Sequence, residues 1–329
     1  MQLFKAFRTT EDNGKFVSSV MEIPLDTLPT NEVLVKVHYS GINYKDLLSS
    51  KGNKGVTKTY PHTPGIDAAG IVVSDSTGVF KAGDEVVVMG YDLGMNTDGG
   101  FAEYISVPAE WVLPKPERFT LKETMLIGTS GFTAALGISK ILRMGQSPED
   151  GAVVVTGATG GVGGFAVQML SKLGFDVFCV TGKSDMEDTL LKLGAKKVLM
   201  RDEFMVPKEK ALVRPKFAGG VDTVGGDMLV SLLKQLSKSG SVATCGNVGG
   251  AELNMTVLPF ILNGINLLGI NAADTPMKVR KEVWHLLSEV VSPEQVASLG
   301  REITLEEISS AIDAMSEGIH TGRFLIRLV

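Results

Sequence analysis

The chain has 329 residues, of which 44% are hydrophobic and 21% are charged, so it is long enough for two domains with a large core. Its 32 basic and 37 acidic residues give a formal net charge of −5, and no long basic block occurs, which argues against nucleic acid as a partner. No apolar run reaches the roughly 18 residues of a membrane span, and the N-terminus lacks the apolar region and cleavage site of a signal peptide. We therefore expect a soluble, cytoplasmic protein with no membrane partner.

The residue pattern of the first third of the chain is typical of β-strands. Strands at this spacing predict a compact, barrel-like domain. Two prolines and several charges within 113–120 interrupt the pattern, and a helical stretch follows at 121–142. The strand-like runs, rich in β-branched and aromatic residues and separated by Gly, Pro, Asn and Asp, are 32–42, 68–74, 84–90 and 101–108.

From residue 151 onward, strands and helices alternate, which predicts a doubly wound parallel sheet. After the last of these strands, we expect two more helices and a terminal strand. The predicted elements, in order, are strand 152–158, helix 160–174, strand 176–182, helix 184–195, strands 196–200 and 221–225, helix 227–237, strands 240–246 and 265–271, helices 276–291 and 305–318, and strand 322–329.

A glycine-rich stretch, TGATGGVGG at 156–164, leaves a buried strand and opens a helix. In a parallel sheet this is where ligands bind, because the helix N-terminus presents free N–H groups. Its spacing matches the dinucleotide fingerprint, with alanine in place of the first glycine. A purely structural turn is the alternative. The predicted cofactor-binding residues of this loop are Ala158, Thr159, Gly160, Gly161, Val162 and Gly163.

The end of the second strand of this unit indicates which nucleotide is bound. Strands that hold NAD usually end near a carboxylate that accepts from the ribose 2′-hydroxyl. Here the strand ends in Thr181, Gly182, Lys183 and Ser184, whose hydroxyls and ammonium suit a 2′-phosphate. Asp185 follows, and we interpret it as a helix-initiating residue. The sequence therefore favours NADPH over NADH, and a solvated surface lysine is the alternative role for Lys183.

Several motifs together resemble those of the medium-chain dehydrogenase/reductase superfamily, over essentially the whole chain. The similarity is greatest with its zinc-free quinone oxidoreductase branch, and within that branch with the bacterial acrylyl-CoA reductase group. The motifs include GINYKD at 41–46, PGIDAAG at 64–70, GTSGFTAA at 128–135, VTGATGGVG at 155–163 and VDTVGG at 221–226.

The resemblance implies an α/β protein of two domains. A GroES-like β-barrel domain would span 1–124, completed by about 272–329, and a Rossmann NADP-binding domain would span 125–271. It also implies an active-site cleft between them. Relatives are commonly homodimers joined through their Rossmann sheets, for which 265–271 is a plausible contact strand, although it could equally be an ordinary edge strand.

The resemblance also allows metal chemistry to be tested by position. Zinc-dependent relatives have a cysteine where this chain has Asn43, a histidine where it has Ile66, and a cysteine at about Ser130. None of these three residues is a competent zinc ligand, so we expect a reductase that works without metal.

Without a Lewis acid, hydride addition to a conjugated C=C bond or a quinone is easier than alcohol oxidation, because the substrate's own carbonyl accepts the charge. Asn43 and Tyr44 are the predicted catalytic residues; Tyr44 is assigned first to cofactor contact and second to proton donation. Asp46 and Asp67 are expected in structural ion pairs or turns. The resemblance further implies cofactor contacts at Thr133, Leu268, Gly269, Ile270 and Asn271, and a phosphate partner in Arg323, for which a surface position is the alternative.

The leading hypothesis is an NADPH-dependent reductase of α,β-unsaturated carbonyl compounds, with an acrylyl-CoA-like thioester as the small-molecule substrate. A quinone oxidoreductase on the same scaffold is the first alternative, and a non-catalytic NADPH-binding protein is the second. Binding of coenzyme A would call for basic residues near the cleft. Lys45, Lys51, Lys54 and Lys58 could supply them, although a run of charges is usually only solvated.

Overall fold

The structure, a computed structural model, describes residues 2–297, 299–320 and 322–329. The chain divides into two compact units. The first unit extends to Thr129 and adds Ala273–Trp284 and Ser292–Val329, whereas the second unit comprises Ser130–Ala272 and His285–Val291. The two units are described separately.

The second unit is built on a six-stranded parallel sheet in the order β10-β9-β8-β11-β12-β13. This is the strand order of a doubly wound dinucleotide-binding sheet. The chain adds β9 and β10 on one side of β8, and then β11, β12 and β13 on the other side. The predicted α/β class and parallel sheet are therefore confirmed. The strands are β8 (Val153–Thr156), β9 (Val177–Thr181), β10 (Lys197–Met200), β11 (Phe217–Asp222), β12 (Leu236–Thr244) and β13 (Asn266–Gly269).

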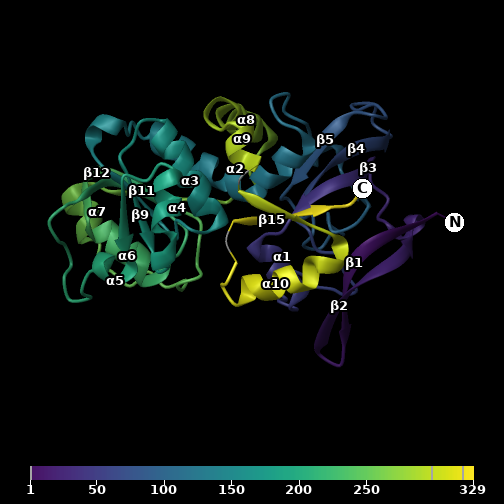
Figure 1. Ribbon diagram of the computed structural model, residues 1–329, viewed down its shortest axis with the longest axis horizontal. Coiled ribbons are helices and arrows are strands. Elements are labelled where there is room, and N and C mark those ends of the chain that lie inside the picture. The colour runs from purple at the N-terminus through teal and green to yellow at the C-terminus, as the bar shows by residue number, and fades with distance from the viewer. Residues whose placement is uncertain (1, 298, 321) are drawn as a thin grey trace. The chain divides into compact units, whose positions relative to one another are not determined.

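Helices cover this sheet because its central strands are apolar on both sides. Every residue of β8 is buried, as expected of a parallel strand with both faces covered. Figure 1 shows the helices grouped around β9, β11 and β12. They are α3 (Gly161–Lys172), α4 (Glu187–Lys192), α5 (Arg201–Phe204), α6 (Gly226–Lys234) and α7 (Leu258–Asn263).

Two predicted strands of this unit have different bounds in the structure. The strand expected at 221–225 is the end of β11, which already stops at Asp222 because the chain then turns into α6. The strand expected at 240–246 is β12, which begins earlier, at Leu236. In both cases the apolar pattern identified the strand and misplaced its ends.

The first unit contains a mostly antiparallel seven-stranded sheet. In its central strand β3, Val33, Val35 and Val37 point into the core, and the residues between them are more exposed, which is the alternation of a half-buried strand. The strands are β3 (Val33–Gly41), β4 (Asp67–Asp75), β5 (Glu85–Met89), β6 (Tyr104–Val107), β7 (Val112–Pro114), β14 (Gly300–Ile303) and β15 (Arg323–Arg327).

A separate two-stranded ladder at the N-terminus, not predicted from the sequence, is formed by β1 (Leu3–Asp12) and β2 (Lys15–Pro24). Single bridges join Ala6 to Ala102 and Thr9 to His62, so the ladder belongs to the first unit. The side chains of β2 are half-buried or exposed, which leaves only a weak hydrophobic pattern to detect.

Helix α2 (Leu121–Arg143) is kinked at Gly128, whose φ of 45° and ψ of −158° lie outside the helical region. By length and composition it is the one described helix that could cross a membrane, but 72% of its most apolar window is buried inside the protein. Its apolar residues thus pack mainly in the interior of the protein.

The remaining helices lie near the start and the end of the chain. Tyr44, which was expected in a loop, is instead the first residue of α1 (Tyr44–Ser50), and α1 contacts α10 (Figure 1). The two helices expected at the C-terminus are present, together with a short helix and the strand β14 that were not predicted. The helices are α8 (Met277–Val290), α9 (Pro293–Ala297) and α10 (Ile308–Ser316).

Candidate functional site

The glycine-rich loop connects β8 to α3 at the carboxyl edge of the parallel sheet. Gly157 has a φ of 61°, a conformation that favours glycine. A Cβ added at Gly163 would overlap the Gly157 carbonyl oxygen, so the helix can approach the loop this closely only without a side chain there. These two glycines therefore bring the loop and the first turn of α3 together into a compact cradle.

The predicted residues of the loop separate into two groups. Ala158 and Gly163 are buried and pack the loop against the sheet. Gly160 is exposed, and Gly161 and Val162 are half-buried at the first turn of α3, where helix N–H groups have no partner within the helix. These groups fit a pyrophosphate, because an anion near a helix N-terminus is stabilised by the N–H groups and by the helix dipole.

The end of β9 lies beside this loop, because the two strands are neighbours in the parallel sheet. Thr181 is buried, and its hydroxyl accepts a hydrogen bond of 3.0 Å from the Lys183 backbone N–H. Ser184 opens a short 3-10 helix, Ser184–Met186, which contains Asp185 in its first turn. The predicted helix-initiating role of Asp185 agrees with this position.

A cationic side chain that was not predicted from the sequence, that of Arg201, lies beside the end of β9. The guanidinium of Arg201 lies over Gly182, with Nη2 2.9 Å from the position that a Cβ of residue 182 would occupy. Arg201 is exposed and directly follows β10. The only sequence signal was an arginine at the end of a strand, which carries little information without the strand pairing.

A buried carboxyl group, also missed, ties three strand ends together. Asp222, at the end of β11, accepts from the Thr156 hydroxyl at 2.7 Å, from the Thr244 hydroxyl at 3.0 Å and from the Gly225 N–H at 3.0 Å. Burial raises the pKa of Asp222, although these hydrogen bonds act in the opposite direction. The network fixes the carboxyl ends of β8, β11 and β12.

The predicted contacts near β13 lie at the same carboxyl edge of the sheet. Gly269 ends β13, and its carbonyl accepts from Lys140 Nζ at 2.7 Å. Leu268 and Ile270 are half-buried and Asn271 is exposed. Thr133, in contrast, is buried within α2, with 8% of its surface exposed.

In the first unit, Asn43 turns its amide inward. Its Nδ2 donates to Asp67 Oδ2 at 2.8 Å and to the Gly41 carbonyl at 3.1 Å, and its Oδ1 accepts from Arg323 Nη1 at 3.3 Å. The side chain was expected to face cofactor and substrate. The structure places it differently, because the buried charges beside it need hydrogen-bond partners.

Arg323 also differs from the expectation. It is buried in β15, where Nη2 lies 3.5 Å from Asp67 Oδ2, so it is neither at the surface nor directed at a phosphate outside the core. Asp67 additionally accepts from the Thr129 N–H at 2.8 Å and from its hydroxyl at 2.6 Å. The structural ion pair expected for Asp67 is therefore present.

Asp46 stabilises the loops on either side of α1. Its carboxylate accepts from the backbone N–H groups of Asn43 at 2.7 Å, Gly65 at 3.0 Å and Ile66 at 2.9 Å. Burial raises the pKa of Asp46 to about 7, with a smaller contribution from the charge of Asp67, while the hydrogen bonds act to lower it. The acid is buried behind the loop and acts structurally.

Tyr44 is the accessible member of the predicted catalytic pair, with 48% of its surface exposed. It begins α1 directly after the capping residue Asn43, so the buried network fixes the backbone from which the ring projects. Asn43 is thus buried, whereas nearly half of the Tyr44 surface is exposed.

The lysines considered for coenzyme A are partly engaged with acids. Lys51 pairs with Asp313 at 2.7 Å and Lys54 pairs with Glu11 at 2.5 Å. Both pairs are at the surface, where such interactions contribute little and exchange readily.

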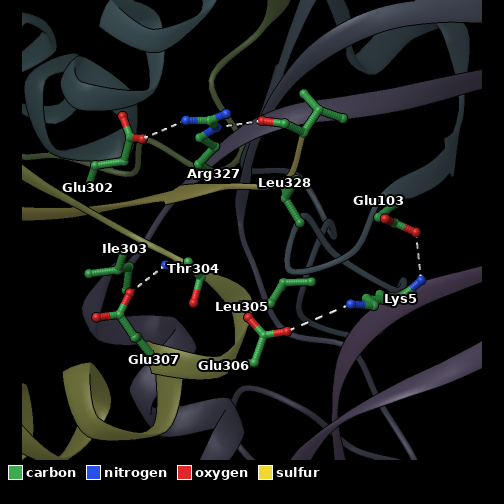
Figure 2. A pocket seen from close by; sticks show the side chains of 11 residues that line it. Lys5, Glu103, Glu302, Ile303, Thr304, Leu305, Glu306, Glu307, Arg327 and Leu328 are labelled. Carbon is green, nitrogen blue, oxygen red and sulfur yellow. Dashed lines mark hydrogen bonds and ion pairs between the residues drawn. The ribbon is translucent and has the colours of Figure 1, made fainter.

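A pocket of about 390 Å³ lies in the first unit, at the end of β15, and Figure 2 shows the side chains that line it. Ion pairs cross its surface between Lys5 and Glu306 and between Arg327 and Glu302, at 3.9 Å and 3.7 Å. None of the predicted site residues lines it. The hollow is therefore distinct from the candidate site.

Two of the three positions that carry zinc ligands in the zinc-dependent relatives hold side chains that offer no ligand here. Ile66 is buried and apolar, and the Asn43 amide is committed to Asp67 and Arg323. Across residues 2–297, 299–320 and 322–329, no group of three or more His, Cys, Asp or Glu side chains is arranged to hold a metal ion.

Comparisons with known proteins match both units. The family "Alcohol dehydrogenase GroES-like domain" matches residues 29–117, and "Zinc-binding dehydrogenase" matches residues 161–289. YhfP of Bacillus subtilis, whose name is that of a quinone oxidoreductase, is 45% identical over 327 residues, 99% of each chain. Acrylyl-CoA reductase AcuI of Ruegeria pomeroyi is 38% identical over 316 residues, 96% of each chain.

Two solved structures resemble the whole chain. The yhdH oxidoreductase of Salmonella enterica in complex with NADP has a TM-score of 0.96 and 38% identity, covering 99% of this chain and all of the other. Bacillus subtilis yhfP with NAD bound has a TM-score of 0.97 and 44% identity, with full coverage of both chains.

Proposed function

Because the chain belongs to the medium-chain dehydrogenase/reductase superfamily, we propose that it transfers a hydride from NADPH to the C=C bond of an α,β-unsaturated carbonyl compound, with an acrylyl-CoA-like thioester as substrate. The family assignment confirms the resemblance seen in the sequence and the GroES-like nature of the first unit. The chain is an oxidoreductase of this superfamily; the substrate and the independence from metal are our proposals.

The observation that carries the proposal is the cradle at the carboxyl end of β8. It combines an exposed Gly160, the open first turn of α3 and, on the next strand, the Thr181–Ser184 segment. These features suit the pyrophosphate and the 2′-phosphate of NADPH. The Salmonella relative with bound NADP supports this cofactor, whereas the Bacillus relative was solved with NAD.

When bound, the reduced nicotinamide would supply the hydride, and the conjugated carbonyl of the substrate would take up the negative charge. The chain's own task is then to orient the two reactants and to exclude water. Tyr44 is the proposed contact to the cofactor and a candidate proton donor. Asn43 acts on it indirectly, as the residue that fixes the start of α1.

No ligand set supports zinc at the position of Asn43, Ile66 and Ser130, so we propose that the reaction proceeds without metal. The similarity to acrylyl-CoA reductase AcuI, which spans 96% of both chains, supports the proposed acrylyl-type substrate. We further propose a cytoplasmic homodimer joined through the edge strand β13. In the segment that precedes this strand in the chain, Val257, Ile261 and Leu262 are 67%, 68% and 59% exposed.

An NADPH-consumption screen tests the function. Purified protein is given acrylyl-CoA, simple enones and quinones, and the series is repeated with NADH. We expect the highest kcat/KM with acrylyl-CoA and NADPH. If acrylyl-CoA is no better than simple quinones, the thioester assignment is wrong; if NADPH binds but no acceptor is reduced, the protein is a non-catalytic binder.

Acrylyl-pantetheine provides the matched control for coenzyme A recognition, since it has the same reacting group without the nucleotide. Binding energy from remote groups of a substrate commonly contributes to kcat/KM. We expect kcat/KM to fall with the truncated thioester. Equal values would show that the enzyme recognises only the acrylyl thioester itself.

A further inference from the structure

Two aromatic rings and a guanidinium form a stack in the first unit, directly after β5. The ring of Tyr91 lies nearly parallel to that of Trp111, with 5.5 Å between the ring centroids and 8° between the ring planes. The guanidinium carbon of Arg280, whose residue is only 3% exposed, lies over the Tyr91 ring at 4.2 Å from its centroid. The stack thus joins the turn after β5, the short 3-10 helix Ala109–Trp111 and the first turn of α8.

The backbone at this stack is left-handed at two successive residues. Gly90 has a φ of 68°, which is ordinary for glycine, but Tyr91 has a φ of 51°, which is uncommon for an aromatic residue. A Cβ on Gly90 would lie 3.0 Å from the Cα of Ala273 and 3.1 Å from its carbonyl oxygen, so glycine lets the two segments approach. Because a strained conformation persists only where its surroundings impose it, we looked for the contacts that hold this turn.

These contacts converge on the backbone of Ala273. Its carbonyl oxygen accepts from the Tyr91 N–H at 2.9 Å and from Arg280 Nη2 at 2.6 Å. Arg280 Nε donates to the Thr275 carbonyl oxygen at 2.9 Å. Ala273 is the residue at which the chain returns to the first unit after β13, and one residue separates it from the predicted cofactor contacts at 268–271. The guanidinium therefore fixes the chain immediately after that segment.

We propose that Arg280 is a positioning residue, which holds the backbone at 268–271 in the place where it contacts the nicotinamide half of the cofactor. This inference rests on the proposed function, because it takes 268–271 as a cofactor contact. A planar guanidinium can donate to two carbonyl groups while its face lies on a ring, whereas the ammonium of a lysine has no such plane. Since a displacement of 1 Å can cost about 100-fold in rate, a residue outside the contact can control the reaction.

Arg280→Lys tests the guanidinium while the charge is retained. The affinities of NADPH and of 2′,5′-ADP, which lacks the nicotinamide half, are measured by calorimetry on the full-length proteins. We expect NADPH to bind about 10-fold more weakly to the variant, with an unchanged affinity for 2′,5′-ADP. Arg8→Lys is the matched control, because Arg8 has a side chain only 13% exposed in the same unit and pairs with Asp98 instead. It should leave both affinities unchanged.

Steady-state kinetics with acrylyl-CoA separates positioning from a loss of folded protein. In Arg280→Lys we expect kcat to fall by about 10- to 100-fold, with little change in the KM for the acceptor. A change that only destabilised the fold would lower the free energy of unfolding, but the protein that stays folded would keep both affinities. The selective loss of NADPH binding is therefore the deciding measurement.

Tyr91→Asn gives a second test in which the buried charge is left in place. Asparagine tolerates a left-handed backbone, so the turn is kept while the ring under the guanidinium is lost. We expect the same selective loss of NADPH affinity as in Arg280→Lys. The double variant should lose no more than the larger single loss, since the two changes act on one contact. Fully additive losses would contradict this geometry.

The outcomes separate this inference from the proposed function. Equal weakening of NADPH and 2′,5′-ADP in Arg280→Lys, or no weakening of either, would overturn the positioning role. If NADPH binding is lost selectively but the wild-type protein reduces no acceptor, the inference stands and the proposed reaction does not. If the wild-type protein prefers NADH, the comparison is made with NADH and 5′-AMP, and the same selective loss supports the inference.

Discussion

Arg323 and Asp67 form an ion pair inside the first unit, with Nη2 3.5 Å from Oδ2 and side-chain exposures of 3% and 0%. The pair joins the last strand of the chain to β4 and supports the amide of Asn43. Since both charges are removed from water, each depends on the other for compensation.

Replacing Arg323 by Met should therefore lower the free energy of unfolding by about 3–5 kcal/mol, because the Asp67 carboxylate would stay buried without its cation. Chemical denaturation measures the effect. Lys51→Met is the control, since it breaks an exposed pair with Asp313 and should cost at most about 1 kcal/mol. Similar losses in both variants would show that burial of the Arg323 pair has no special energetic role.

Stability should fall as the pH rises through the titration of Asp46. Its pKa is raised from 3.8 to about 7, so between these values the folded protein retains a proton that the unfolded chain has released. The free energy of unfolding then decreases with rising pH in this window and levels off above it. Asp46→Asn has no carboxyl group at this position, so its stability lacks this pH dependence. Denaturation at a series of pH values should show that its free energy of unfolding, relative to wild type, rises by up to roughly 4 kcal/mol between pH 3.8 and about 7. A constant difference would mean that Asp46 titrates normally.

Two glycines of the cradle should respond differently to substitution. Gly160→Val should abolish NADPH binding without unfolding the protein, because the residue is exposed and its added Cβ would meet only the Gly157 carbonyl oxygen, at 3.3 Å. Gly164→Ala is the matched control: its nearest contact would be 3.8 Å away, so NADPH affinity should be unchanged. The NADPH affinity of both variants is measured by calorimetry. Normal affinity in Gly160→Val would refute the position assigned to the pyrophosphate.

Tyr44 should act through its ring. Tyr44→Ala should raise the KM for NADPH by about 10-fold, in line with the loss of one contact, whereas Tyr44→Phe should stay near wild type. Steady-state kinetics with acrylyl-CoA separates the two roles considered for this residue. A large fall in kcat for Tyr44→Phe, with KM unchanged, would assign proton donation to the hydroxyl instead.

A charge on the apolar side of α7 should separate the subunits of the proposed dimer. Ile261→Glu places a carboxylate on α7, the exposed helix that directly precedes the edge strand β13 in the chain and packs on β12. Light scattering after size exclusion should report a monomer, while Val79→Glu, an equally exposed valine of the first unit, should leave the dimer intact. A wild-type monomer would remove this interface.

The sequence predicted the parts of the fold whose signals are local. The strand, glycine loop and helix from Val153 to Lys172 were recognised because buried strands and glycine spacing are visible in the residues themselves. The β1–β2 ladder was missed because β2 has no buried face. Strand ends such as Asp222 were misplaced because tertiary packing, rather than propensity, decides where a strand stops.

The site was harder to predict where it depends on contacts between distant segments. Arg201 reaches Gly182 only through the pairing of β10 with β9. Arg323 and Asn43 are hydrogen-bonded although they lie 280 residues apart in the sequence, and no pattern in either segment predicts this contact. Burial reversed the expected orientation of Asn43 for the same reason, because the charges it satisfies come from elsewhere in the chain.

The inward amide of Asn43 also limits how this site could change during evolution or design. A cysteine at this position would restore the first ligand of the zinc-dependent relatives, but it would remove the donor to Asp67 Oδ2 and the acceptor for Arg323 Nη1. A thiolate beside the Asp67 carboxylate would add like-charge repulsion. A cysteine introduced at position 43 alone should therefore destabilise the core, and further substitutions would be needed to compensate Asp67 and Arg323 before a zinc ligand set could form.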